Sequence, residues 1–485
     1  MEQNNLRNSV LGGFFWKFCE RFLNQGITFV TSLVLARLLA PEDYGTIALV
    51  TVFISLASVF INSGFSTALI QKKDADDRDF STMFFCSLAC SGLIYAVLFF
   101  AAPLIAKIYD TPELTLILRV FSLQIPLSVY QSIQTAYISR HLLFQKVFIA
   151  SVINAVVCGI VGIGMAMAGC GVWALVFQHL AGTLSNTIVC LFLIPWRPKW
   201  QFSKSSAKSM MRYGSRILAA DLSGTFFSEV RSLIIGGVYS SADLAYYNKG
   251  QQIPQLITNN LSTVLVSVMF PTLANYSDDL QQVKMMAKRS FRVLAYILVP
   301  CMFGLVAVME PLVLLLFTQK WEQMIPFGQV LSIGACISLI GSISLQILKA
   351  IGRSDVVLGL EVKKKPVYVL LLIIGVNINV FGLAAAMVIY DAYAVFVNML
   401  QLKKYISYGL REQMRDLLPA FMLGAVMAVL VWLIPSFNSL ILTLMVKVLA
   451  GAAVYVVGSI VFRMEALQYL KNMVIEYIGK YKQKQ

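Results

Sequence analysis

The chain has 485 residues, of which 58% are hydrophobic and 13% charged, and its mean hydropathy is +0.75. An ordinary soluble protein is excluded, because soluble domains are about half apolar and about one-quarter charged. The formal net charge of +15 would indicate nucleic-acid binding in a soluble chain, but here the basic residues lie in short segments between apolar stretches. The composition therefore predicts a membrane protein and no nucleic-acid partner.

Apolar stretches long enough to cross a membrane recur from one end of the chain to the other. A helix needs about 20 apolar residues to span the hydrocarbon core, and the alternation expected of a β-barrel strand is missing. We predict fourteen transmembrane helices, near residues 12–36, 44–63, 81–105, 115–136, 147–168, 172–194, 215–238, 253–273, 290–309, 326–348, 366–379, 382–400, 417–434 and 438–462. Residues 366–400 fit one re-entrant hairpin or two full spans.

The basic residues are divided unevenly between the two sides of these predicted spans. Cytoplasmic loops carry an excess of Lys and Arg, and nearly all loop Lys and Arg residues fall on alternate loops, starting with the N-terminal segment. The opposite loops contain only Arg37, Lys107, Lys249 and Lys320. We therefore expect both termini on the cytoplasmic side. The first apolar stretch is too long for a signal peptide, so we expect it to be retained.

The first predicted span has a polar face. Lys17, Glu20, Arg21, Asn24 and Gln25 recur on one side of a helix, opposite a phenylalanine-rich side. A charged side chain at mid-bilayer costs about 2.5–3.5 kcal/mol, so this face must contact protein or water. Two interpretations remain open: the face lines a hydrated cavity, or Glu20 pairs with Lys17 or Arg21 and locks helices together.

Other polar residues lie within later spans. The charged ones are Arg119, Asp221, Glu229, Arg231, Asp391 and Lys447. A shared hydrated cavity would remove the cost of placing them in a membrane, whereas Lys447 fits equally well as a side chain that reaches the membrane surface. His179, in the sixth span, is expected to be a packed polar residue rather than a proton relay.

An internal repeat relates the two halves of the chain. A shift of 200 residues aligns 32–48 with 232–248, including Asp43 with Asp243, and it aligns the polar stripe of Arg21 and Gln25 with Asp221 and Thr225. Because the shift covers six predicted spans, it predicts two parallel lobes with a site between them. We expect lobes at 1–200 and 201–410, followed by two additional spans and a cytoplasmic tail at 411–485. The tail fits an interfacial helix or a solvated segment.

Three segments carry a resemblance to a known family: "LARLLAPEDYGTIALV" (35–50), "GFSTALIQKKD" (64–74) and "YYNKGQQIP" (246–254). The chain resembles the polysaccharide transporter family, the Wzx-type flippases of the MOP superfamily, which also includes MATE exporters and MurJ-type lipid II flippases. Pro41 in the first segment fits the end of one helix, and the acidic residues after it fit the start of the next.

The resemblance implies an all-α fold with two six-helix lobes around a central cavity, plus two C-terminal helices. It implies a flippase that moves an undecaprenyl-pyrophosphate-linked oligosaccharide across the bacterial plasma membrane by alternating access, acting as a monomer. Lys17, Arg21, Arg119 and Arg231 are then the candidates to hold the pyrophosphate, which requires cationic donors. Asn24 and Gln25 are candidates to bind sugar hydroxyls.

Ion coupling is a further expectation. By analogy with related exporters, Asp221, Glu229 and Asp391 are candidates to bind H⁺ or Na⁺, although Glu229 fits a structural pair with Arg231 equally well. We expect no metal site and no other cofactor. Polysaccharide polymerase and export proteins are the expected partners.

Three alternative functions remain. A MurJ-type lipid II flippase shares the pyrophosphate chemistry, and a MATE-type drug exporter shares the fold with a more acidic and aromatic cavity. A membrane glycosyltransferase or polymerase needs a sizeable loop with catalytic residues, and the predicted outer loops are short. No GxxxxGK[ST] motif is present, so we expect no ATP hydrolysis. Because the outer loops are short, we expect no other enzymatic activity either.

Overall fold

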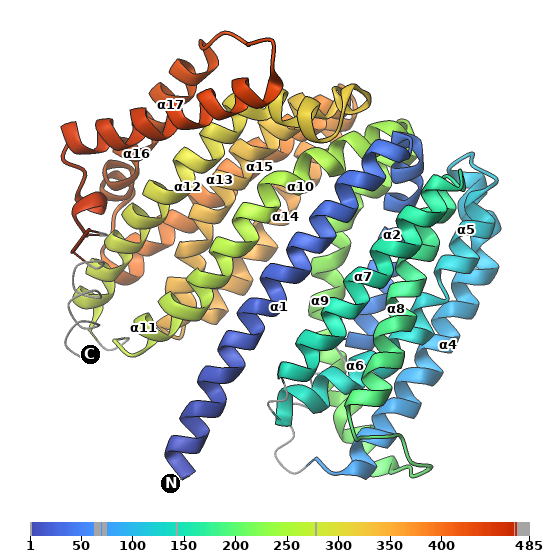
Figure 1. Cartoon of the computed structure of the whole chain (residues 1–485). Coiled ribbons are helices and arrows are strands. Elements are labelled where there is room, and N and C mark those ends of the chain that lie inside the picture. The colour runs from blue at the N-terminus through green and yellow to red at the C-terminus, as the bar shows by residue number, and fades with distance from the viewer. Residues whose placement is uncertain are drawn as a thin grey trace. The chain divides into compact units, whose positions relative to one another are not determined.

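The computed structural model describes residues 2–62, 69, 75–141, 144–276, 279–469 and 471–472, and the regular elements in these ranges are all helices. The chain divides into two compact units, Met1–Ala245 (unit 1) and Tyr246–Gln485 (unit 2), and Figure 1 shows the helices of each. This confirms the predicted all-α class. The "GFSTALIQKKD" segment, most of the C-terminal tail and the side chain of Lys17 lie outside the described part.

Among the described residues, unit 1 contains eight helices and the first turn of a ninth. They are α1 (Glu2–Leu38), α2 (Pro41–Ile61), α4 (Asp77–Ile108), α5 (Leu114–Phe121), α6 (Gln124–His141), α7 (Phe144–Met167), α8 (Val172–Leu193), α9 (Lys204–Val238) and the start of α10 (Ser241–Val264). α1 packs on α7, α7 on α8, α2 on α9, and α4 on both α5 and α6. Side chains such as Phe80, Tyr130 and Trp196 form a buried aromatic core beneath α4 and α6.

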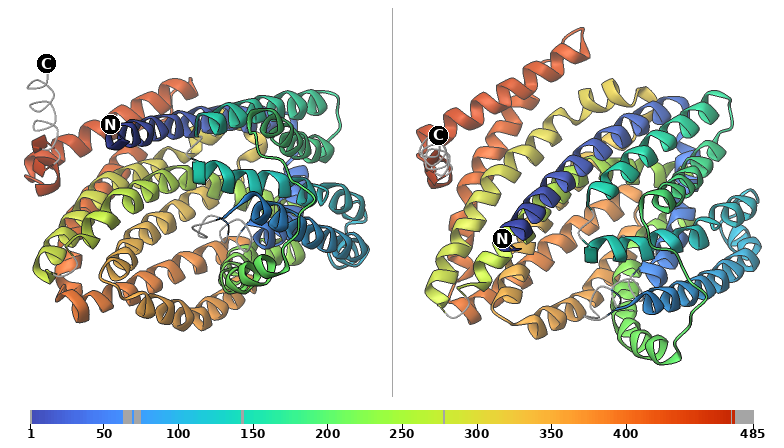
Figure 2. Two further views of the ribbon diagram at one scale, coloured as in Figure 1. Left: turned by 90° about the horizontal axis from the view of Figure 1, so that it is seen from below. Right: turned by 60° about the horizontal axis from the view of Figure 1, so that its bottom comes forward.

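Unit 2 contains the rest of α10 and the helices that follow it. They are α11 (Phe270–Ala274), α12 (Leu280–Leu316), α13 (Met324–Ala350), α14 (Ser354–Val376), α15 (Val380–Ile406), α16 (Leu410–Trp432) and α17 (Leu440–Val461), with a π-helical turn at Leu265–Met269. α13 packs between α12 and α15, and α14 packs on α15. Figures 1 and 2 show α16 and α17 as a helix pair that packs on α12.

The number of spans agrees with the prediction. Eleven helical stretches among the described residues are long and apolar enough to cross a membrane, with α5 and α6 counted together as Leu114–Ile138. The helices α1, α9 and α14 are also long, but each carries charged residues. Together they make the fourteen predicted spans, so the chain is a multi-pass membrane protein.

The ambiguous segment 366–400 forms two full helices, α14 and α15, joined by residues 377–379. The prediction that Lys363, Lys364 and Lys365 lie in a loop is wrong, because α14 already begins at Ser354. Lys364 is only 3% exposed, and its Nζ donates to Glu361 Oε1 at 2.6 Å and to Asn398 Oδ1 at 3.2 Å. This pairing offsets the cost of burying the ammonium group.

Two further lysines are buried in helices. The position of Lys249 differs from the prediction, and that of Lys447 decides between the two interpretations left open by the sequence. Lys249, predicted in an outer loop, lies inside α10 and is 8% exposed, because that helix begins at Ser241, well before the predicted span. Lys447 of α17 is 6% exposed and shares the buried face of its helix with Thr443 and Gly451. Its side chain is therefore enclosed by protein along most of its length.

The two copies of the repeat have the same backbone arrangement at the starts of α2 and α10. α1 ends at Leu38 and α2 begins at Pro41, as predicted, and the Ala40 N–H donates to Asp43 Oδ2 at 3.1 Å. After α9, the Ser240 N–H donates to Asp243 Oδ2 at 3.2 Å. The aligned aspartates thus cap aligned helix starts in the same way.

The compact units group helices by their contacts, and by this measure α9 belongs with α2 and α4 in unit 1. The predicted boundaries at 200 and 410 follow the sequence repeat instead. The contacts do not test that criterion, so these boundaries stay a prediction.

Candidate functional site

A cavity of about 430 Å³ lies within unit 1. Four helical regions line it: α2, the junction of α5 and α6, α8 and α9. Its polar lining residues are Thr51, Ser55, Ser58, Gln124, His179 and Thr225. This volume falls within the range of about 300–1,000 Å³ that is typical of small-molecule sites.

Three hydroxyl groups of the lining come from one face of α2. Thr51, Ser55 and Ser58 are spaced i, i+4 and i+7, so an α-helix presents them on the same side. The Thr51 hydroxyl donates to the Ile47 carbonyl at 2.7 Å, which leaves its oxygen able to accept. The face is therefore a row of small groups that can both donate and accept hydrogen bonds.

Gln124, the first residue of α6, supplies an amide to the cavity. Its Oε1 atom is buried and has no hydrogen-bond partner among the described residues. A buried acceptor without a partner costs about 1–3 kcal/mol. Because this atom has almost no accessible surface, it is the rest of the Gln124 side chain that lines the cavity.

The apolar part of the lining is formed by Ile54 and Phe121. The Phe121 ring is 2% exposed and meets the His179 ring edge-on, with centroids 5.4 Å apart. This contact orients the imidazole, which is accessible from the cavity. His179 is therefore more than the packed polar residue that we expected.

The predicted polar face of α1 is described from Cys19 onward. Arg21 is exposed, Asn24 and Gln25 are half-buried, and α1 packs on α7. Glu20 Oε1 accepts a hydrogen bond from the Ser151 hydroxyl of α7 at 2.9 Å. α7 thus provides a polar neighbour for the buried edge of this face, while Arg21 stays accessible.

Arg119 lies on α5 and contacts α4. Its Nε donates to the Phe99 carbonyl at 3.1 Å, and its guanidinium lies 4.2 Å from the centroid of the Phe99 ring. Arg119 thus contacts α4, whereas the helix that carries Arg21 packs on α7. Convergence of Lys17, Arg21 and Arg119 on one chamber is therefore not shown and stays a prediction.

The candidate ion-binding residues on α9 lie close to Thr225, which lines the cavity. Asp221 is exposed and Glu229 half-buried, one helical turn to either side of Thr225. Arg231 is close enough to Glu229 to interact electrostatically with it. Asp391 belongs to unit 2, where its carboxylate lies against Gly334 of α13.

Most of the residues that line the cavity are not among the candidates predicted from the sequence. The serine and threonine spacing on α2 is a usable signal, because it places three hydroxyl groups on one face of an apolar helix. Gln124 gave no such signal, since it is the first residue of a helix and has no periodic partners. Thr225 was already part of the aligned stripe, and the structure places it in the cavity wall.

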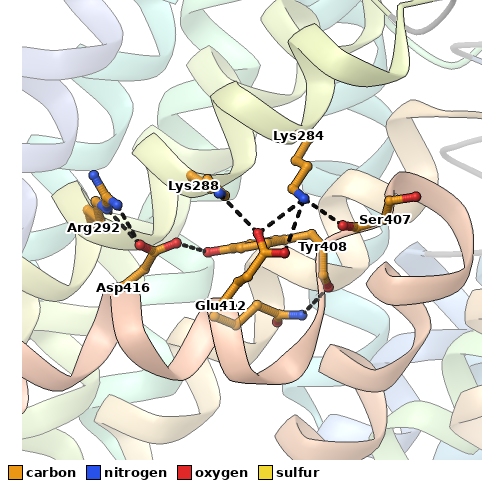
Figure 3. Close-up of polar contacts among 8 residues, drawn as sticks. Lys284, Lys288, Arg292, Ser407, Tyr408, Glu412 and Asp416 are labelled. Carbon is orange, nitrogen blue, oxygen red and sulfur yellow. Dashed lines mark hydrogen bonds and ion pairs between the residues drawn. The ribbon is translucent and has the colours of Figure 1, made fainter.

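A charged cluster in unit 2 joins α12 to α16 (Figure 3). Its members are Lys284, Lys288, Arg292, Tyr408, Glu412 and Asp416. Lys284 and Lys288 bind Glu412 at 3.1 and 3.0 Å, and Arg292 binds Asp416 at 2.6 Å. Burial and the hydrogen bond to Asp416 raise the pKa of Tyr408, so its hydroxyl stays protonated and donates. This cluster attaches the last two helices to the rest of unit 2.

Comparison with known proteins decides the family. The model of the family described as "Polysaccharide biosynthesis protein" matches residues 34–326, more than half of the chain. The chain belongs to this family. The match includes the Pro41 to Gly45 segment and most of the cavity-lining helices, and it confirms the resemblance seen in the sequence.

The curated relatives are named as proteins of polysaccharide biosynthesis, and one of them as a transport protein. The succinoglycan biosynthesis transport protein ExoT of Rhizobium meliloti (strain 1021) is 23% identical over 70% of this chain and 69% of its own length. The lipopolysaccharide biosynthesis protein WzxC of Escherichia coli (strain K12) is 22% identical over 76% of each chain.

Solved structures share the fold. The lipid II flippase MurJ in an inward closed conformation superposes with a TM-score of 0.76, at 15% identity, over 93% of this chain and 99% of its own. An inward-facing MATE family multidrug transporter of the MOP superfamily gives a TM-score of 0.60 at 14% identity, over 80% of this chain and 98% of its own. Identities this low support the common fold and nothing finer.

Proposed function

We propose that this protein is a flippase that translocates an undecaprenyl-pyrophosphate-linked oligosaccharide across the bacterial plasma membrane. The observation that carries the proposal is membership of the polysaccharide biosynthesis family together with a fold shared with a flippase. Named relatives that act in succinoglycan and lipopolysaccharide biosynthesis support it. The protein works by alternating access and not by an enzymatic step.

The headgroup requires two kinds of recognition. A diphosphate is held best by cationic donors, and Arg21 is accessible for this role on α1, with Lys17 one turn before it. Arg119 and Arg231 are secondary candidates. Asn24 and Gln25 are neighbours of Arg21 that can bind sugar hydroxyls.

Coupling to H⁺ or Na⁺ through Asp221, Glu229 and Asp391 is part of the same proposal. A carboxylate in a membrane-embedded cavity is costly unless it binds a cation or a proton, which is the basis for this role. Polymerase and export partners, a monomeric state and cytoplasmic termini remain predictions.

Transport in proteoliposomes tests the function. The full chain is reconstituted with a fluorescent undecaprenyl-pyrophosphate-linked trisaccharide. The measured quantity is the rate at which lipid from the inner leaflet moves to the outer leaflet, where an external, membrane-impermeant quencher removes its fluorescence. We expect wild-type protein to accelerate this rate over empty liposomes. Arg21→Gln should reduce it at least ten-fold, because a hydrogen bond to a charged group contributes about 1.5–3 kcal/mol.

Arg37→Gln is the matched control, since it makes the same substitution at an exposed position near the end of the same helix. It should retain the wild-type rate. Equal losses in both variants would contradict a specific role for Arg21. Equally fast movement of fluorescent lipid II would favour the alternative, a lipid II flippase.

A further inference from the structure

We infer that unit 1 holds, at the end predicted to be cytoplasmic, a site for the headgroup of a zwitterionic phospholipid with a primary ammonium group, phosphatidylethanolamine. The site is an open pocket of about 600 Å³ between the start of α4 and the segment that joins α8 to α9. Its lining residues are Asp76, Asp77, Arg78, Trp200, Gln201 and Phe202. The inference does not depend on the proposed function, since it concerns a lipid of the surrounding membrane.

The segment that joins α8 to α9 is fixed on the first turns of α4. The Lys199 N–H donates to the Ser81 hydroxyl at 3.1 Å, and the Ser203 N–H donates to the Thr82 hydroxyl at 3.0 Å. Trp200 lies between these two attachments in the chain. Because this wall of the pocket is already held in place, a ligand does not have to order it on binding.

Trp200 presents an aromatic surface to the pocket. Its indole stacks on the Phe85 ring of α4, with ring centroids 5.0 Å apart, yet the residue is 95% exposed. Tryptophan is enriched at the headgroup level of membranes, because its ring is apolar and its N–H is polar. The face of an indole also attracts an ammonium group. Trp200 is therefore suited to contact the cationic part of a lipid headgroup.

The acidic groups of the pocket complement an ammonium group. Asp76 caps α4, since its Oδ1 accepts from the Asp79 N–H at 2.8 Å, and its other carboxylate oxygen makes no hydrogen bond among the described residues. Asp77 binds Lys199 Nζ at 2.7 Å, but its side chain is 53% exposed. A primary ammonium group can donate to such carboxylate oxygens, whereas a quaternary ammonium group has no hydrogen to donate.

Arg78 supplies the opposite charge. It is exposed, and one of its guanidinium nitrogens donates to the Phe202 carbonyl at 3.4 Å. A guanidinium has five N–H donors and is well matched to a phosphate group, so Arg78 retains donors for a lipid phosphate. Carboxylates and a guanidinium in one pocket fit a headgroup that carries both charges.

The pocket lies where a lipid beside α4 would place its headgroup. The exposed apolar side chains of this helix recur on one face, at Leu93, Val97, Phe100 and Leu104. This face fits lipid acyl chains, and Phe85 lies two turns from Leu93 toward the start of α4. Asp76 immediately precedes α4, and the predicted span begins at residue 81. The charged groups of the pocket are thus at the level of the headgroups.

Lipid binding to the full chain tests the site. The delipidated protein is titrated in detergent with phosphatidylethanolamine, phosphatidylcholine or phosphatidylglycerol that have the same acyl chains, and native mass spectrometry measures the affinity for the first bound lipid. A hydrogen bond to a charged group contributes about ten-fold in affinity. Phosphatidylethanolamine should therefore bind about ten-fold more tightly than phosphatidylcholine, and also more tightly than phosphatidylglycerol, which has no cationic group.

Trp200→Ala should lower the affinity for phosphatidylethanolamine about five-fold, because the ammonium group loses the indole face. Trp200→Phe should keep most of the affinity, since it retains an aromatic face. The matched control is Trp432→Ala at the end of α16, because Trp432 is also exposed and does not line the pocket. The control should bind phosphatidylethanolamine as the wild-type protein does.

Asp76→Asn should reduce the ten-fold preference for phosphatidylethanolamine over phosphatidylcholine to about two-fold. This variant should fold, because asparagine caps a helix about as well as aspartate does. The matched control is Asp355→Asn, an exposed aspartate in the first turn of α14 that does not line the pocket. It should keep the ten-fold preference.

Equal affinity for the three lipids would overturn the site, since it would indicate non-specific lipid contact. Tighter binding of phosphatidylglycerol would also overturn it, in favour of a site for anionic lipids. An unchanged preference in Asp76→Asn, or equal losses in Trp200→Ala and Trp432→Ala, would show that the pocket does not bind the lipid. The flippase proposal is unaffected by these outcomes, because the transport assay tests it separately.

Discussion

Asp416 and Glu412 lie on consecutive turns of α16 and both bind cations of α12, but their surroundings differ (Figure 3). The Asp416 side chain is 5% exposed and accepts from both Arg292 and Tyr408. The Glu412 side chain is 45% exposed, so water competes for its partners. At the scale of single residues, burial decides which of two ion pairs stabilises the protein.

Asp416→Ala should therefore destabilise the protein by about 1.5–3 kcal/mol, because Tyr408 loses its charged acceptor and Arg292 keeps only its ion pair with Glu465. Glu412→Ala should have little effect, because exposed ion pairs contribute little. Thermal unfolding of both variants in the same detergent measures the difference. Similar losses of thermal stability in the two variants would show that burial does not decide which ion pair contributes more to stability.

At the scale of elements, the starts of α2 and α10 approach each other closely within unit 1. A Cβ atom built on Gly45 of α2 would lie 1.7 Å from the Ser241 carbonyl oxygen, at the first residue of α10. Backbone atoms cannot move aside as a flexible side chain can. The glycine of the Pro-Glu-Asp-Tyr-Gly segment is thus required by the packing of two repeat-related helix starts.

Gly45→Ala should lower the thermal stability or the folded yield, with a cost of at least about 1–3 kcal/mol from overpacking. Gly92→Ala in α4 is the control, since a Cβ there meets no atom within 4 Å, and alanine favours a helix more than glycine does. We expect the control to be neutral or slightly stabilising. A stable Gly45→Ala protein would mean that α2 and α10 can separate without loss.

At the scale of the whole molecule, the topology follows from an even number of spans and the distribution of positive charge. The loop at 351–353 carries Arg353 and is predicted to be cytoplasmic, whereas the loop between α16 and α17 is predicted to be outside. Because α14 begins at Ser354, the loop at 351–353 is shorter than predicted, but the order of the spans is unchanged.

Cysteine labelling checks this topology. Ser436→Cys, in the loop between α16 and α17, should react with a membrane-impermeant maleimide in intact cells. Ser354→Cys, at the start of α14, should react only after permeabilisation, and both positions are exposed. The reverse labelling pattern would place the termini outside.

Hydropathy and charge determined a large part of this protein from its sequence. The membrane location, the number of spans and the end of α1 at Pro41 follow from local patterns, because each depends on residues close in the chain. The repeat of Asp43 and Asp243 follows from aligning two such local patterns. Only the tertiary structure decided which polar groups meet. Helical periodicity assigns Ser55 or Thr225 to a face, but the rotation of each packed helix decides what that face contacts. For this reason the shared cavity, the buried acceptor of Gln124 and the enclosure of Lys364 could not be read from the sequence.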